Sequence, residues 1–383
     1  MGRLRARMAG LRGRAPAWDS FGHWAPGAAI LVLVFTVLLL AAAAWTDRSD
    51  LNKSGGGAEV ATAPAPVAQS PGDAATSGNE DLELYTVIAQ RVAGGEGYHR
   101  VAVEEQRARD FPVRPGLAVR LPALAHLTAF LGPTGMAVLA GIIALLTIVA
   151  WYRRLGDEPG REEHRTIALM LLMIGALIGM KAQYLVLHEV WAGLLLALSF
   201  GLHRPGKWFL AWLAAAAALA IREHALPFVL LMGAMAMFRR DWREMLAWGG
   251  LVLAFAVGLG IHLAIVSDLV SPADPASAPW LVLRGLGGWT SNITLSSALY
   301  LLPGVIAAPL ALLALLPLLG WAGWKSDAGL FGFLLFAGYG VFFMLADRDS
   351  NFYWALVITP WWFMGLVFVP RALKALINSA RGR

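Results

Sequence analysis

The sequence predicts an all-α fold, a polytopic transmembrane helical bundle of about ten spans. Of 383 residues, 58% are hydrophobic and 15% are charged, whereas a soluble domain carries about 25% charged residues. The hydrophobic residues are also gathered into repeated runs of helical length, more than a water-soluble core could bury. These runs lie at about 26–45, 134–152, 166–180, 190–203, 207–221, 225–238, 246–266, 302–320, 329–346 and 354–370.

The lengths of these runs differ. A bilayer core about 30 Å thick needs about 20 helical residues, so the four shorter runs between 166 and 238 predict tilted helices or helices with polar ends in a cavity. The first run follows basic residues, as a secretory signal would, but it has no small-residue cleavage site after Trp45. We therefore interpret 26–45 as a retained first span.

Basic residues predict the orientation, because Lys and Arg next to spans stay on the cytoplasmic side. An even number of spans with both termini inside places most Lys and Arg in inner segments. The same rule explains the net charge of +6, so no nucleic-acid partner is expected. The short outer loops then hold one basic residue each, namely Lys181, Arg222, Arg284 and Arg348.

The spans and the polar segments divide the chain into six parts. Residues 49–80 are rich in Gly, Ala, Ser and Pro without apolar periodicity, which is typical of a flexible linker. The parts are a cytoplasmic basic N-terminus (1–25), the first span (26–45), a low-complexity linker (46–80), an extracytoplasmic loop with a juxtamembrane helix (81–131), a multi-span domain (132–370) and a cytoplasmic basic tail (371–383).

The extracytoplasmic loop begins with a predicted amphipathic helix. Its apolar positions recur at helical spacing at Leu82, Tyr85, Ala89 and Val92. Such a helix lies along a membrane surface, and the glycines from Gly94 to Gly97 end it. The prolines of 111–122 then predict a rigid turn that leads back to the membrane and carries Arg114 and Arg120. A second outer segment at about 267–300, with several prolines, predicts a loop with interfacial aromatic residues, and most of the 16 Trp residues are expected to anchor the bilayer interface.

Polar residues gather in three outer connections, 181–189, 222–224 and 347–354, on the same predicted face as Asp81. Ionisable groups near membrane depth are costly and usually serve a pathway or a reaction. This face is therefore expected to carry out chemistry or to bind a charged ligand.

Several of these residues have two interpretations. Asp81 would cap a helix start or act chemically, and a divalent cation held by Glu80, Asp81 or Glu189 is an open alternative. His188 and Glu189 either extend to interfacial water or face a ligand; as neighbours on a helix they diverge by ~100° and do not form a metal site alone.

Two arginines have the same ambiguity. Arg222 either pairs with Glu223 next to His224 or binds a phosphate through its planar fork. Arg348, between two aspartates, has the same two interpretations, and Asn351 and Tyr353 beside it suit sugar recognition.

One motif adds a family resemblance. Asp81, Tyr85 and Ala89 form Asp-x3-Tyr-x3-Ala, followed by the Gly-x-Gly-Tyr sequence that ends at Tyr98. Together with the single preceding span, this pattern resembles the first outer loop of the GT-C superfamily of integral membrane glycosyltransferases, which use polyprenyl-phosphate sugars. The family aspartate usually follows the first span closely, whereas about thirty low-complexity residues precede Asp81 here.

The resemblance implies a mannosyltransferase-like enzyme of a bacterial inner membrane, which moves a sugar from a polyprenyl phosphate to an extracytoplasmic glycan, lipid or protein. Asp81 would be the catalytic base, and Arg222 or Arg348 would neutralise the leaving phosphate. The alternative is a secondary transporter or lipid flippase; no ATP-binding motif is present. Expected substrate-binding residues are Tyr85, Tyr98, Arg114, Arg120, His188, Glu189, Arg222, His224, Arg348, Asn351 and Tyr353.

Overall fold

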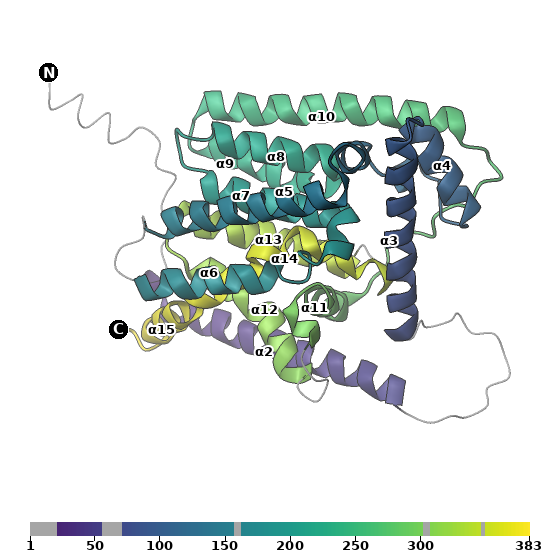
Figure 1. Ribbon diagram of the computed structural model, residues 1–383. Coiled ribbons are helices and arrows are strands. Elements are labelled where there is room, and N and C mark those ends of the chain that lie inside the picture. The colour runs from purple at the N-terminus through teal and green to yellow at the C-terminus, as the bar shows by residue number, and fades with distance from the viewer. Residues whose placement is uncertain (1–20, 56–70, 157–161, 302–306, 346–348) are drawn as a thin grey trace, which may run out of the picture.

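The computed structural model describes residues 21–55, 71–156, 162–301, 307–345 and 349–383 (Figure 1). Over these residues the chain is helical and has no strand, only the isolated bridges Arg114–Ala276 and Arg204–Lys207. The predicted all-α class is confirmed. The α-helices are α2 (Pro26–Gly55), α3 (Pro71–Ala93), α4 (Tyr98–Ala108), α5 (Ala123–Gly156), α6 (Glu162–Ala176), α7 (His188–Leu202), α8 (Phe209–Ile221), α9 (Leu226–Phe238), α10 (Trp242–Leu269), α11 (Gly285–Leu295), α12 (Ala307–Gly323), α13 (Asp327–Leu345), α14 (Thr359–Trp362) and α15 (Val369–Ala380).

Five helical segments are long and apolar enough to cross a membrane, as a multi-pass membrane protein requires. They are Pro26–Ala44, Gly116–Gly156, Trp242–Leu269, Asp327–Leu345 and Thr359–Ala380. Five further apolar helices are only 10–17 residues long, and they include all four runs that the sequence marks as short. These are His164–Ala176, His188–Leu202, Phe209–Ile221, Glu223–Phe238 and Leu313–Gly323.

The long helices run side by side in one bundle, and α3 runs across one end of it (Figure 1). Helix α7 is central, because it packs against α5, α8 and the 3-10 helix η7 (Asp349–Val357). The first helix, α2, packs on α12 and α15 at the side of the bundle. The end that α3 covers is called the α3 end below.

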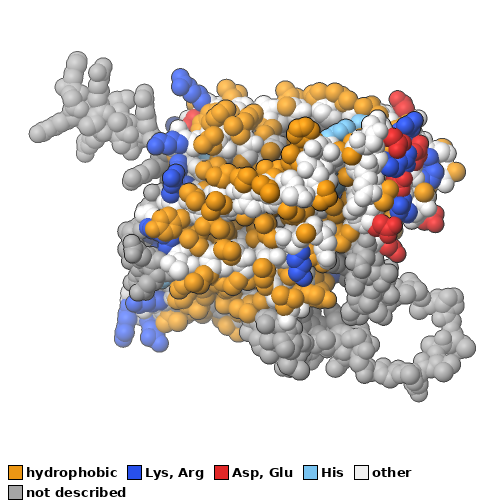
Figure 2. Space-filling model, viewed as in Figure 1, with side chains coloured by type: hydrophobic (Ala, Val, Ile, Leu, Met, Phe, Trp, Pro, Cys, Tyr) orange, Lys and Arg blue, Asp and Glu red, His pale blue; other side chains and the backbone are white. Residues whose placement is uncertain are grey.

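Hydrophobic side chains cover the visible side of the bundle, with Lys and Arg along one edge and charges of both signs at the opposite edge (Figure 2). Leu31 of α2, Leu145 of α5 and Leu253 of α10 are among the exposed apolar residues. A water-soluble monomer rarely exposes so large an apolar surface. This hydrophobic surface is typical of the lipid-facing side of a membrane protein.

The tryptophans correct the interpretation from the sequence. Trp151, Trp191, Trp321, Trp361 and Trp362 are fully buried in the core rather than placed at an interface. Close backbone approach makes this packing possible: a Cβ at residue 320 or 365, both glycine, would collide with its neighbours. Large rings then fill the space between the helices with few voids.

Three features of the helices were not predicted from the sequence. Helix α3 begins at Pro71, before the expected start at Asp81, and it ends at Ala93. Helix α5 is broken at Gly132, whose φ of 65° favours glycine. Within the expected outer loop 267–300, residues Gly285–Leu295 form α11.

Candidate functional site

The α3 end brings together polar residues from distant parts of the sequence. Helix α3 packs against α5, η7 and the 3-10 helix η3 (Ala182–Val186), and α7 packs against η4 (Glu223–Ala225). The N-terminus of α7 therefore lies beside the α8–α9 junction. Sequence reasoning expected polar groups from these connections on one face, and the fold does bring them to one end of the bundle.

Asp81 is the acidic group at the centre of this region. It lies inside α3, well after Pro71, so it does not occupy the N-cap position and the capping interpretation is wrong. Its side chain is 8% exposed. Burial raises the pKa of Asp81 to about 6, and the Tyr353 hydroxyl and the Arg120 charge oppose part of that rise. The carboxyl group is therefore mostly ionised at neutral pH but close to its titration range.

Tyr353 in η7 is the direct partner of Asp81. Its hydroxyl donates a hydrogen bond of 2.8 Å to Oδ2 of Asp81, and both side chains are buried. A donor to an ionised carboxylate stabilises the charged form. The phenol is thus a hydrogen-bond partner of the carboxylate, whereas the sequence suggested a sugar-stacking role for Tyr353.

Arg120, just before α5, supplies positive charge to the same region. Its Nε donates to the Tyr85 hydroxyl at 3.1 Å, and its backbone oxygen accepts a 2.6 Å bond from the Tyr98 hydroxyl. Tyr85 is four residues after Asp81 on α3, so both side chains point to one face of the helix. Within the described part of the chain, the terminal nitrogens of Arg120 make no hydrogen bond, which leaves its fork open for an anion.

Arg222, in contrast, is paired with two carboxylates, although its Nη2 has no hydrogen-bond partner among the described residues. It is 0% exposed, its Nη1 bonds Glu223 Oε1, and its Nε lies 2.8 Å from Oε1 of Glu189, which is 1% exposed. The Arg222–Glu189 contact is an ion pair by distance but not a hydrogen bond, because neither Arg222 Nε nor Glu189 Oε1 has a partner of acceptable hydrogen-bond geometry. The pairing of Arg222 with Glu223 that the sequence left open is therefore present. The ring of Trp354 also lies 5.8 Å from the guanidinium carbon.

His224 completes this buried group. Its Nε2 lies 3.9 Å from Glu223 Oε1, and its ring contacts the Trp354 ring edge-on at 4.6 Å between centroids. The Tyr339 hydroxyl donates to the backbone oxygen of His224. These contacts fix the α8–α9 junction against α13 and η7.

Other expected site residues lie elsewhere or outside the description. The Nε of Arg114 donates to the backbone oxygen of Asp274 at 2.9 Å, in the loop after α10, so Arg114 serves a loop contact. Arg348 lies outside the described residues, as does the side chain of Asn351. Glu80 is exposed on α3. Among the described residues, no group of three or more His, Asp or Glu side chains is arranged to hold a metal ion, Glu80, Asp81 and Glu189 included.

A second buried polar network lies at the opposite end of α7, about 22 Å away for a helix of 15 residues. Glu244 Oε1 lies 2.7 Å from His203 Nε2 and accepts from Trp248 Nε1 at 3.2 Å. Its Oε2 accepts from Arg239 Nη2 at 2.9 Å. This network, which the sequence analysis missed, connects the ends of α7, α9 and α10. The Glu244 carboxylate contacts three polar side chains, which fits a structural role.

Comparisons with known proteins give no match. No model of a protein family, no curated protein and no solved structure matches this chain. The functional argument therefore depends on the α3 end alone.

Proposed function

We propose that this protein is a membrane glycosyltransferase that moves a sugar from a polyprenyl-phosphate donor to an extracytoplasmic acceptor. The observation that carries the proposal is the buried carboxylate of Asp81. It lies one helical turn from Tyr85, whose hydroxyl accepts from Arg120, a guanidinium with terminal nitrogens that make no hydrogen bond among the described residues. A base and an anion-binding group at one end of an apolar bundle suit a donor with a lipid tail and a phosphosugar head.

In the proposed reaction, Asp81 removes the proton from an acceptor hydroxyl while the oxygen of that hydroxyl forms a bond to the anomeric carbon of the sugar. The bond between that carbon and the phosphate oxygen breaks, and the phosphate leaves with the electron pair. A general base must be ionised, and a pKa of about 6 satisfies this at neutral pH. The Tyr353 hydrogen bond holds the carboxylate in place.

Arg120 takes the leaving phosphate in this proposal. The sequence suggested Arg222 or Arg348, but two carboxylates already neutralise the Arg222 guanidinium. Among the described residues, the side chain of Arg120 hydrogen-bonds only through its Nε, to Tyr85, so its two terminal nitrogens remain for phosphoryl oxygens. A planar fork that is always charged suits that role better than a lysine would.

The proposal includes the placement in a bacterial inner membrane. The five full-length spans and five shorter helices together make about ten, the layout expected of a GT-C-like bundle. Both termini would lie in the cytoplasm and α3 along the outer surface, with loop 81–131 extracytoplasmic. The placement is supported by Arg239 and Arg204, which lie at the end of the bundle opposite Asp81.

One observation favours a second candidate, a secondary transporter or flippase. The Arg222–Glu189 pair is buried at the end of a short apolar helix, and intramembrane ion pairs often belong to transport pathways. Vesicles that contain the purified protein would distinguish the two: a transporter moves its solute without cleaving a donor.

The test is reconstitution with a panel of polyprenyl-phosphate sugars labelled in the sugar. The proposal expects release or transfer of the label from at least one donor in the panel, with polyprenyl phosphate as the second product. Failure to cleave any donor by well-folded protein in lipid bilayers would contradict it.

A further inference from the structure

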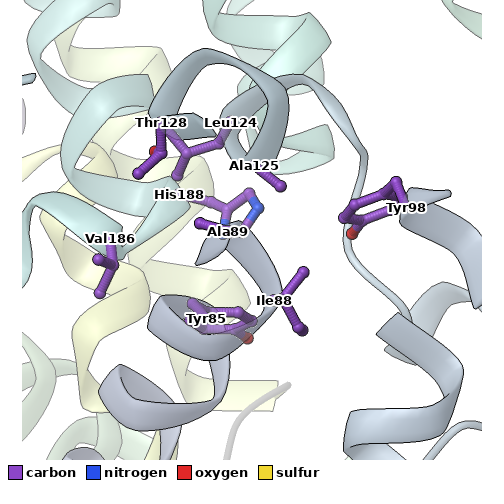
Figure 3. A pocket seen from close by; sticks show the side chains of 9 residues that line it. All are labelled: Tyr85, Ile88, Ala89, Tyr98, Leu124, Ala125, Thr128, Val186 and His188. Atoms are coloured by element: carbon purple, nitrogen blue, oxygen red, sulfur yellow. The ribbon is translucent and has the colours of Figure 1, made fainter. Parts of the chain in front are cut away.

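A small pocket lies next to the Asp81 region, between α3, the start of α5 and η3 (Figure 3). It encloses about 290 Å³ of empty space including its open mouth. Its walls are mostly apolar and include Ile88 and Leu124, and its narrow interior admits a group about the size of one water molecule. Such a pocket suits a single functional group of a larger molecule.

His188 is the polar group of the pocket that most clearly points to a ligand. The side chain is 4% exposed, lines the pocket, and contacts the Tyr85 ring at 5.1 Å between centroids. The ring comes near the Leu121 backbone, but neither nitrogen makes a hydrogen bond of acceptable geometry within the described residues. A buried polar group without a partner is costly, and in native proteins such a group usually meets a water or a ligand.

Two hydroxyl groups share the pocket with His188. Tyr85 accepts a hydrogen bond from Arg120, which leaves its own proton for another acceptor, and Thr128 lines the pocket from α5. Figure 3 shows Tyr85, Thr128 and His188 around one space, from three different elements. The polar atoms are therefore few and convergent, as in small-molecule sites.

The chemistry of the imidazole selects the ligand class. Burial and the nearby charges of Arg120 and Arg222 favour the neutral form of the ring over the positively charged form. A neutral imidazole offers one donor and one acceptor. A carboxylate only accepts and an ammonium group only donates, whereas a hydroxyl group does both and fits apolar walls without a counter-charge.

We propose that this pocket binds a neutral, hydroxyl-bearing group of the molecule that accepts the sugar. The hydroxyl donates one hydrogen bond to the imidazole of His188 and accepts one from the hydroxyl of Tyr85. Tyr85 belongs both to the pocket and to the Arg120 contact. A hydroxyl-bearing molecule anchored here lies beside the helical turn that carries Asp81. The identification of this molecule as the acceptor rests on the proposed glycosyltransferase function, whereas the binding of a hydroxyl group does not.

The test uses the absence of cysteine from the sequence. In lipid nanodiscs, Thr128→Cys introduces a single thiol into the pocket, and Phe130→Cys introduces one at an 86% exposed position of the same helix. Each thiol is treated with methyl, 2-hydroxyethyl or 2-sulfonatoethyl methanethiosulfonate. The thiolate attacks the reagent sulfur, a disulfide forms and methanesulfinate leaves. The ratio of the hydroxyethyl to the methyl rate cancels the reactivity of the thiol itself.

The hydroxyethyl reagent is expected to be favoured at Thr128→Cys and not at Phe130→Cys. Two hydrogen bonds of about 1 kcal/mol each make that preference roughly ten-fold or more. His188→Leu should lower it to the few-fold preference that the Tyr85 bond alone provides, and His188→Gln, which keeps a donor and an acceptor, should retain most of it. The anionic reagent should react most slowly. If Thr128→Cys prevents folding, Ala125→Cys provides a second thiol in the pocket.

Four outcomes would each overturn the proposal. They are equal ratios at the two thiols, a preference unchanged by His188→Leu, a preference for the anionic reagent, and an unreactive pocket thiol. Labelling requires no sugar donor. Selective labelling of a protein that transfers no sugar therefore contradicts only the proposed function. Unselective labelling of an active transferase contradicts only the pocket.

Discussion

The hydroxyl of Tyr353 lies 2.8 Å from Oδ2 of Asp81, and this hydrogen bond joins residues 272 positions apart in the sequence. It connects the helix that runs across the end of the bundle to the 3-10 helix that follows α13. Because both side chains are buried, the bond affects both the position of the carboxylate and its proton affinity.

Tyr353→Phe removes this donor and keeps the ring. The charged carboxylate then loses its hydrogen bond, so the pKa of Asp81 should rise further above its value of about 6. A charge-assisted hydrogen bond of about 1.5–3 kcal/mol corresponds to about one to two pH units. The acidic limb of the pH–rate profile should move to higher pH by that amount. Tyr339→Phe, which removes a buried hydroxyl bonded to the His224 backbone, is the control and should leave the limb in place.

Asp81→Asn should not destabilise the protein at neutral pH. The folded-state pKa of Asp81 is raised from 3.8 to about 6, so its contribution to stability is fully present below pH 3.8 and is lost as pH rises through 6. Above pH 6 the buried charge costs up to about 3 kcal/mol, which asparagine removes while it still accepts from Tyr353. Thermal unfolding at pH 7.5 should show the variant at least as stable as the parent, with its advantage lost near pH 4. A less stable variant at pH 7.5 would show that the carboxylate stabilises the fold.

Arg222→Leu should act on folding. It leaves Glu189 and Glu223 without their cation, and breaking a buried ion pair costs about 3–5 kcal/mol. Arg120→Gln should cost less, because Arg120 is half-buried and, among the described residues, its side chain hydrogen-bonds only to Tyr85. Thermal unfolding of the purified variants measures the difference. A stable Arg222→Leu protein with a specific loss of donor binding would return the phosphate role to Arg222.

The proposed orientation places the α3 end outside the cytoplasm and the opposite end of the bundle inside. A reporter inserted after Gly95, in the turn between α3 and α4, should lie outside the cytoplasm, and one after Gly206, in the α7–α8 loop, should lie inside. Paired reporters of opposite compartment specificity read the two sites. Both reporters on one side would contradict the proposed orientation.

The helical class and most helices follow from local sequence, because long apolar runs can satisfy their backbone groups only as helices in lipid. The run at 26–45 corresponds to the span Pro26–Ala44. The start of α3 could not be predicted, since 71–80 has no apolar periodicity. Helix α11 could not be predicted either, because 285–295 is rich in glycine and other small residues and lacks apolar periodicity.

The candidate site was only partly predictable. The four-residue spacing of Asp81 and Tyr85 places both on one helix face, and that could be inferred from the sequence. The engagement of Arg222 and the openness of Arg120 could not, because each depends on contacts between helices that are distant in the chain. Tryptophan content was misleading for the same reason: the sequence does not reveal that Trp321 and Trp361 meet in a core.

The most direct measurement of the central claim is the rate of sugar transfer by Asp81→Asn in reconstituted vesicles at pH 7.5, with a donor that the parent protein cleaves. Glu83→Gln, an exposed acid on the same helix, is the matched control. Loss of a general base lowers rates by about 100- to 10,000-fold, so the account predicts a fall in that range for Asp81→Asn and near-parent transfer for Glu83→Gln, with both proteins folded. Normal transfer by Asp81→Asn would contradict the account and remove Asp81 from the chemistry.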